Sequence, residues 1–145
     1  MTTPSEEVLR ARLEPSAVAF WGTLGITTDT VDRVGHVIHA LPWRKDLETR
    51  RPGVMHGGAV ASLIDTAAGA AVLTLREDDD TTWAGIATLD LNVSYLNPVM
   101  TEAVAEATVL RSSRTVVFVG VDVRDREGTL LAVGRCTYAI ARKSS

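Results

Sequence analysis

Residues 57–75 read GGAVASLIDTAAGAAVLTL, the most apolar long stretch of the chain. Nineteen helical residues would just reach across a bilayer. Nine of them are Gly or Ala, however, Asp65 falls near the middle, and no aromatic belt flanks the ends, so the stretch is a poor membrane span. It is apolar on every side, which is typical of a helix enclosed by other elements of a soluble protein. We therefore predict a long buried helix here.

Residues on both sides of this helix predict strands. Residues 87–95 (ATLDLNVSY) alternate strictly between apolar and polar side chains, which indicates a strand with one buried face. Because short turns join consecutive strands, we expect antiparallel pairing. About six strands and one helix inserted after the second predict an α+β fold in which a curved sheet rolls around the helix. The other expected strands are 26–31, 36–43, 103–110, 115–123 and 129–140.

A chain of 145 residues is about one domain in length. We expect a single domain over 16–141 that begins with a short amphipathic helix over 16–24, preceded by a flexible polar segment over 1–15. The acidic residues 77–80 are expected to form a solvated loop.

The charge and the cysteine content limit the partners and the disulfide bonds that we expect for this chain. The formal charge is −3 and no basic stripe occurs, so neither nucleic acid nor an acidic membrane surface is an expected partner. Cys136 is the only cysteine, which excludes an intramolecular disulfide; we expect it to fill space in the core. Charged residues at the start, where a secretory signal would need an apolar core, favour a cytoplasmic location.

Two glycines open the buried helix, directly after His56. The first backbone N–H groups of a helix have no intrahelical partner. Gly57 and Gly58 could therefore bind an anion or form an oxyanion hole, because glycine lets a ligand carbonyl approach the backbone closely. The alternative is a plain glycine turn before a helix.

Asp65 lies on the third turn of the same helix, where small residues such as Ala61 and Gly69 share its face and leave a groove. A buried carboxylate must be paired, hydrogen-bonded or neutralised, so Asp65 is a candidate general base or nucleophile. The alternative is a helix-face carboxylate that meets solvent.

The pattern from His56 to Asp65 (HGGxxxxxxD), followed by LNVSYLNP at 91–98, resembles the hotdog-fold acyl-CoA thioesterases of the phenylacetate-degradation (PaaI-like) type. The likeness extends over 16–141. It implies the hotdog fold, a six-stranded antiparallel sheet wrapped around one long central helix. It also implies hydrolysis of an acyl-CoA thioester to a carboxylic acid and coenzyme A, with no metal and no tightly held cofactor.

The resemblance assigns roles to individual residues. Gly57 would offer its N–H to the thioester carbonyl, with Gly58 beside the substrate and His56 as a helper near the carbonyl. Asp65 would act on the acyl carbon as a nucleophile or general base, and Thr88 would orient the attacking water.

The sequence departs from the family at Arg50, where many relatives have an Asn. Arg50 could contact a substrate carboxylate or a coenzyme A phosphate, or remain a solvated loop residue. Ser113 and Arg114 stand where many relatives have Gly and a basic residue, and we expect them beside coenzyme A. Arg51 and Arg111 are further candidates for its phosphates.

Helix geometry adds an expectation of its own. Gly57 and Asp65 are eight residues apart, which is about 12 Å along one helix axis. One carbonyl cannot meet both, so joint action requires a two-fold homodimer with antiparallel helices and two sites at the interface. The resemblance implies the same arrangement and suggests a homotetramer.

Two other functions remain open. A hydroxyacyl-thioester dehydratase shares the fold but usually relies on a His with an acidic partner, and His36 and His39 are interpreted as ordinary strand residues. A non-catalytic acyl-CoA-binding protein is the stronger rival because of Arg50. Retention of both Asp65 and the glycine pair favours catalysis.

Overall fold

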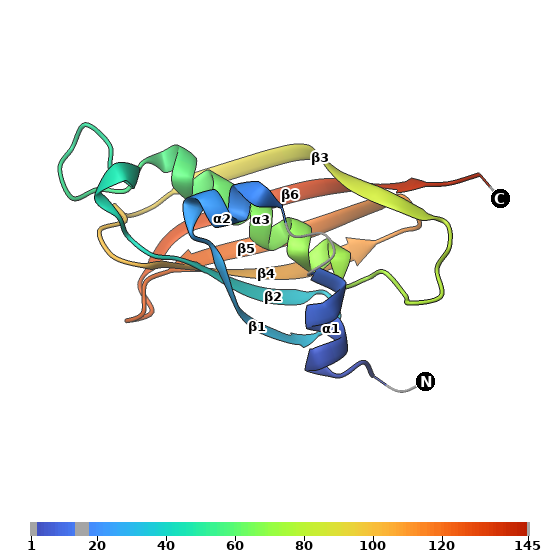
Figure 1. Cartoon of the computed structure of the whole chain (residues 1–145). Coiled ribbons are helices and arrows are strands. Elements are labelled where there is room, and N and C mark those ends of the chain that lie inside the picture. Colours follow the sequence, from blue (N-terminus) through green and yellow to red (C-terminus); the bar gives the residue numbers. More distant parts are fainter. Residues whose placement is uncertain (1–2, 14–17, 145) are drawn as a thin grey trace.

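The computed structural model describes residues 3–13 and 18–144, which form one six-stranded antiparallel sheet with a long helix packed on one face (Figure 1). The strand order is β1-β2-β4-β5-β6-β3, which confirms the predicted hotdog architecture. The helices are α1 (Glu6–Leu13), α2 (Ala19–Leu24), the 3-10 turn η2 (Lys45–Leu47) and α3 (Gly57–Leu73). The strands are β1 (Thr27–Arg33), β2 (His36–Leu41), β3 (Trp83–Tyr95), β4 (Ala103–Ser112), β5 (Val116–Arg124) and β6 (Leu130–Arg142).

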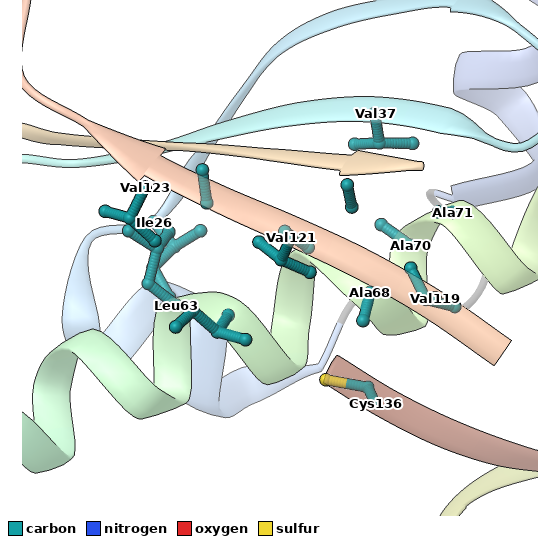
Figure 2. Packing of buried hydrophobic residues seen from close by; sticks show 14 of the residues in the cluster. Ile26, Val37, Leu63, Ala68, Ala70, Ala71, Val119, Val121, Val123 and Cys136 are labelled. Atoms are coloured by element: carbon teal, nitrogen blue, oxygen red, sulfur yellow. The ribbon is translucent and has the colours of Figure 1, made fainter. Parts of the chain in front are cut away.

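The predicted buried helix is α3. His56 caps its start, because Nδ1 of the ring accepts the N–H of Gly58 at 2.8 Å. Thr74 follows its end, and the Thr74 hydroxyl donates to the carbonyl of Ala71 at 2.6 Å. Figure 2 shows Leu63 and Ala68 of α3 facing β5 and β6. Eleven of the seventeen residues of α3 are buried, so burial against the sheet stabilises this Ala-rich helix.

One glycine in β6 lets the sheet approach α3. A Cβ atom at Gly134 would lie 2.6 Å from Cγ2 of Ile64, a fully buried residue of α3. The space that the missing side chain leaves is therefore filled by the helix. Cys136 is fully buried on the same strand, as expected, and burial raises the pKa of its thiol to about 12.

The strand predicted at 87–95 starts earlier, at Trp83, and its apolar side chains are not buried in one chain. Leu89 is 60% exposed and Tyr95 52%. The alternation correctly predicts a strand, but β3 lies at the edge of the sheet with β6 as its only neighbour. This part of β3 is therefore exposed in the single chain.

Within the segment 1–15, which the sequence predicts to be flexible, residues 6–13 form the helix α1. Leu9 is fully buried and Leu13 nearly so, and Arg10 donates to the carbonyls of Thr28 and Asp29. These contacts tie α1 to β1. Of the helix predicted over 16–24, residues 19–24 form α2, and 14–17 lie outside the described residues.

Residues 77–79 of the acidic loop after α3 are exposed, as expected for a solvated loop, whereas Asp80 is half-buried. Asp80 accepts the N–H of Thr82 at 2.9 Å and its hydroxyl at 2.6 Å, and it pairs with Arg142. These hydrogen bonds and the nearby guanidinium hold the pKa of the Asp80 carboxyl well below its usual range. The loop is thereby fastened to the ends of β3 and β6.

The two strand histidines have separate partners. His36 is buried, with Nδ1 2.6 Å from Asp32 Oδ1 and Nε2 2.7 Å from Glu106 Oε2. His39 is fully buried, and its ring packs edge-on against Trp21. Burial lowers the pKa of His39 to about 4. In the part of the chain that the structure describes, no group of three or more His, Cys, Asp or Glu side chains could hold a metal ion.

None of the helices among the described residues combines the length and apolar character that crossing a membrane requires.

Gly134→Ala is expected to lower the free energy of unfolding by about 1–3 kcal/mol, because the added methyl group overpacks the contact with Ile64. Urea denaturation measures this change. The matched control is Gly120→Ala on β5, where a Cβ would make only ordinary contacts with Leu110. Equal stability of both variants would contradict this role for Gly134.

Candidate active site

The start of α3 presents a single free backbone donor. The N–H of Gly58 is already bound to His56 Nδ1. For the N–H of Gly57, no acceptor lies within residues 3–13 and 18–144. Of the two glycines predicted to meet the substrate, Gly57 therefore has the available donor, and Gly58 serves the helix cap.

His56 has a definite tautomer when neutral. Because Nδ1 accepts a hydrogen bond, the proton lies on Nε2. The His56 N–H donates to the carbonyl of Leu47 at 2.7 Å, which fixes the residue at the helix start. His56 is exposed, so its Nε2–H is a second donor close to Gly57.

Tyr95 supports the same helix end and was not anticipated from the sequence beyond its place in a strand. Its hydroxyl donates to the carbonyl of Gly57 at 2.6 Å. A Cβ at position 57 would lie 3.3 Å from the Tyr95 ring, so glycine allows this close contact. Both residues line a cleft of about 380 Å³ that also includes Arg51 and Pro98.

Asp65 is held by two hydroxyl groups from the sheet. Its Oδ1 accepts from Thr88 Oγ1 at 2.8 Å and from the Tyr138 hydroxyl at 2.6 Å, and the single proton of that hydroxyl is shared with the Asp65 backbone carbonyl at 2.7 Å. Thr88 of β3 and Tyr138 of β6 are directly paired across the two strands. The other oxygen, Oδ2, has no hydrogen-bond partner among the described residues, so it is the atom that can act on a substrate or a water molecule.

Tyr138 is the site residue that the sequence analysis missed. Burial and the hydrogen bond to Asp65 raise the pKa of its hydroxyl, so the hydroxyl keeps its proton and donates. Gly69 makes room for it, because a Cβ there would lie 2.9 Å from the Tyr138 hydroxyl. The alternation of buried Cys136, Tyr138 and Ile140 along β6 places Tyr138 on the helix side. Its hydrogen bond with Asp65 joins two residues far apart in the chain, which the local sequence pattern does not predict.

Asp65 lies in a cleft of about 450 Å³ between α2, α3 and the first half of β3. Four of the chain's seven aromatic residues line this cleft. They are Phe20, Trp21, Trp83 and Tyr138. Trp21 and Trp83 line the pocket, whereas Trp43 donates to the carbonyl of Gly53.

The remaining predicted site residues do not gather around Asp65 within one chain. Arg50 is exposed in the loop before α3. The Ser113 hydroxyl holds the β4–β5 turn through Val116, and the Arg114 carbonyl accepts from Arg142. None of the three lines the Asp65 cleft. The Gly57 cleft and the Asp65 cleft likewise share no lining residue.

The comparisons with known proteins agree with this fold. A family model described as the thioesterase superfamily matches residues 52–132. The chain is 36% identical over 127 residues to a putative esterase of Halobacterium salinarum, with 82% of each chain covered. The chain belongs to the thioesterase superfamily.

Other similar proteins span most of its length. Human acyl-coenzyme A thioesterase 13 is 30% identical over 140 residues, with 94% of each chain covered. The solved structure of a conserved protein from Pseudomonas aeruginosa has a TM-score of 0.75 and 29% identity, covering 88% of this chain and 97% of its own.

Tyr138→Phe is expected to lower the thioesterase kcat about 10- to 100-fold. The substitution keeps the ring and removes one hydrogen bond to a charged carboxylate, a contact worth about 1.5–3 kcal/mol. Steady-state kinetics measures the loss, and an unchanged melting curve serves as the folding control. A full-rate Tyr138→Phe protein would show that the hydroxyl does not support Asp65.

Gly69→Ala is expected to reduce kcat by displacing the same hydroxyl. The losses from Gly69→Ala and Tyr138→Phe should then not add in the double variant, because both act through one contact. Strictly additive losses would mean that Gly69 affects the site by another route. Gly22→Ala, where a Cβ meets nothing within 4 Å, is the matched control.

Proposed function

We propose that this thioesterase-superfamily protein hydrolyses acyl-CoA thioesters to a free carboxylic acid and coenzyme A. The observation that carries the proposal is the Asp65 carboxylate, oriented by Thr88 and Tyr138 in an aromatic-lined cleft with Oδ2 left unbound. The similarity to human acyl-coenzyme A thioesterase 13 supports an acyl-CoA as the substrate.

Two chemical routes fit Asp65. In the first, Oδ2 takes a proton from a water molecule whose oxygen attacks the acyl carbon. In the second, Oδ2 attacks the acyl carbon itself, and water then cleaves the resulting anhydride. In both routes the C–S bond breaks and the coenzyme A thiolate leaves and takes up a proton. Neither route requires a metal or a resident cofactor.

The oxyanion formed during attack needs hydrogen-bond donors of its own. The Gly57 N–H and the His56 Nε2–H are the candidates, and they lie about 12 Å along the helix from Asp65 of the same chain. In our proposal they therefore act on the substrate held by Asp65 of a second chain, in a two-fold homodimer. The exposed apolar residues of β3, such as Leu89 and Leu91, support an interface along this edge.

The assembly of dimers into a larger oligomer and the cellular location are inferred from the family resemblance. We infer a homotetramer built from two such dimers and a cytoplasmic location. Arg50, Arg51, Arg111 and Arg114 are the proposed contacts for the coenzyme A phosphates, with Ser113 beside the bound coenzyme.

The two rival functions make different use of these residues. A non-catalytic acyl-CoA-binding protein would have no need of an oriented carboxylate such as Asp65. A dehydratase would need a His with an acidic partner at the substrate. His36 does have two such partners, Asp32 and Glu106, but it lines neither the Asp65 cleft nor the Gly57 cleft.

A free-thiol assay with short, long and aromatic acyl-CoA substrates tests the proposal. Asp65→Asn is expected to lower kcat about 10²- to 10⁴-fold, the range that a lost acid–base group usually costs. Asp79→Asn, in the exposed loop after α3, is the matched control and should keep the parental rate. Binding without turnover by the parent protein, or full activity of Asp65→Asn, would contradict the proposed function.

A further inference from the structure

The Asp65 cleft has a second charged residue at its far end. The cleft runs along one face of α3, past Ser62, Asp65, Gly69 and Leu73, and ends at Arg76. α3 ends at Leu73, and Arg76 follows in a turn in which its N–H donates to the carbonyl of Leu73 at 3.2 Å. Arg76 therefore lies just beyond the C-terminal end of the helix that carries Asp65.

Apolar side chains form part of the wall of this cleft, alongside the hydroxyl groups of Thr66 and Thr88. Leu73, Trp83 and Phe20 contribute to it, and Phe20 is 49% exposed in the single chain. Among the residues that line the cleft, Asp65 and Arg76 are the two charged ones. A ligand that fills the cleft therefore meets the Asp65 carboxylate, a lining of apolar side chains and hydroxyl groups, and the Arg76 guanidinium.

The Arg76 guanidinium has no hydrogen-bond or ion-pair partner within the described residues, although acidic side chains follow it directly in the sequence. Two of those side chains pair with other arginines. Asp78 contacts Arg12 at 3.3 Å, and Asp80 contacts Arg142. Within residues 3–13 and 18–144, the Arg76 guanidinium is therefore left without an ion-pair partner.

We propose that the acyl group cleaved by this thioesterase carries a carboxylate at its far end and that Arg76 is the specificity-determining residue that binds it. The inference rests on the proposed function. The substrate would be the monothioester of a dicarboxylic acid: its thioester lies at Asp65, its methylene chain packs along Leu73 and Trp83, and its carboxylate pairs with Arg76. A guanidinium binds a carboxylate through two parallel hydrogen bonds, which gives this recognition its geometry.

Coenzyme A supplies anions as well, but its fit to this cleft is poorer. Its phosphates carry several negative charges, whereas Arg76 is the one cationic side chain among the lining residues. The pantetheine arm contains two amide groups that lose free energy when buried without hydrogen bonds. A methylene chain gains free energy on burial against the same apolar side chains.

Two substrates that differ only in the terminal group test the proposal: suberyl-CoA, with a distal carboxylate, and octanoyl-CoA, with a methyl group. For the full chain, kcat/KM is expected to be at least about tenfold higher with suberyl-CoA. Arg76→Gln should reduce this ratio to about one. Arg135→Gln, on the sheet face that carries Asn92 and Glu106, is the matched control and should leave the ratio unchanged.

Reversing the charge at position 76 distinguishes a binding role of Arg76 from a purely structural role. Arg76→Glu should raise the kcat/KM ratio of 8-aminooctanoyl-CoA over suberyl-CoA relative to the parent protein. If Arg76→Gln lowers kcat/KM equally for suberyl-CoA and octanoyl-CoA, Arg76 binds coenzyme A instead of the acyl group, and the proposal is overturned. A parental ratio of about one would overturn it as well.

Failure of this inference can be told apart from failure of the proposed function. Octanoyl-CoA hydrolysis that depends on Asp65 but shows no preference for suberyl-CoA refutes the role of Arg76 alone. If no thioester is hydrolysed, the proposed function fails, and calorimetry with the intact esters still compares the two ligands. Tighter binding of suberyl-CoA that is lost in Arg76→Gln supports the carboxylate site, and equal affinities refute it.

Discussion

The rigid helix α3 holds two groups apart, the Gly57 N–H and the Asp65 carboxylate, that are both proposed to act on one thioester. The free N–H of Gly57 lies at the start of α3, and the oriented carboxylate of Asp65 lies about 12 Å further along the axis. Each group has its own cleft, and the two clefts share no lining residue. The proposed dimer follows from this spacing, since antiparallel packing of two copies of α3 would place each glycine opposite the aspartate of the other chain.

Small residues on α3 and the sheet make the aspartate site possible. The absence of a side chain at Gly134 brings β6 against Ile64, and the absence of one at Gly69 admits the Tyr138 hydroxyl. Tyr138 then reaches Asp65 from β6, while Thr88 reaches it from the neighbouring β3. The packing that stabilises the fold thus also orients the carboxylate, because one strand register sets both contacts.

The sequence predicts those parts of the molecule that depend on local pattern. Uniform apolarity revealed α3, alternation revealed the strands, and the spacing from Gly57 to Asp65 placed both residues on one helix. Long-range contacts were not predictable in this way. The capping role of His56, the contact of Tyr95 with Gly57 and the hydrogen bond from Tyr138 to Asp65 join segments far apart in the chain or depend on ring orientation. The burial of Leu9 on the sheet was missed for the same reason.

In the proposed dimer, one working site needs Gly57 from one chain and Asp65 from the other. Complementation between Gly57→Val and Asp65→Asn measures this directly. Each variant alone should be inactive, but after unfolding and refolding together in equal amounts, half of the dimers are hybrids with one intact site each. The mixture should therefore regain about a quarter of the parental activity. A mixture no more active than its parents, or full activity in a strictly monomeric form, would contradict the claim.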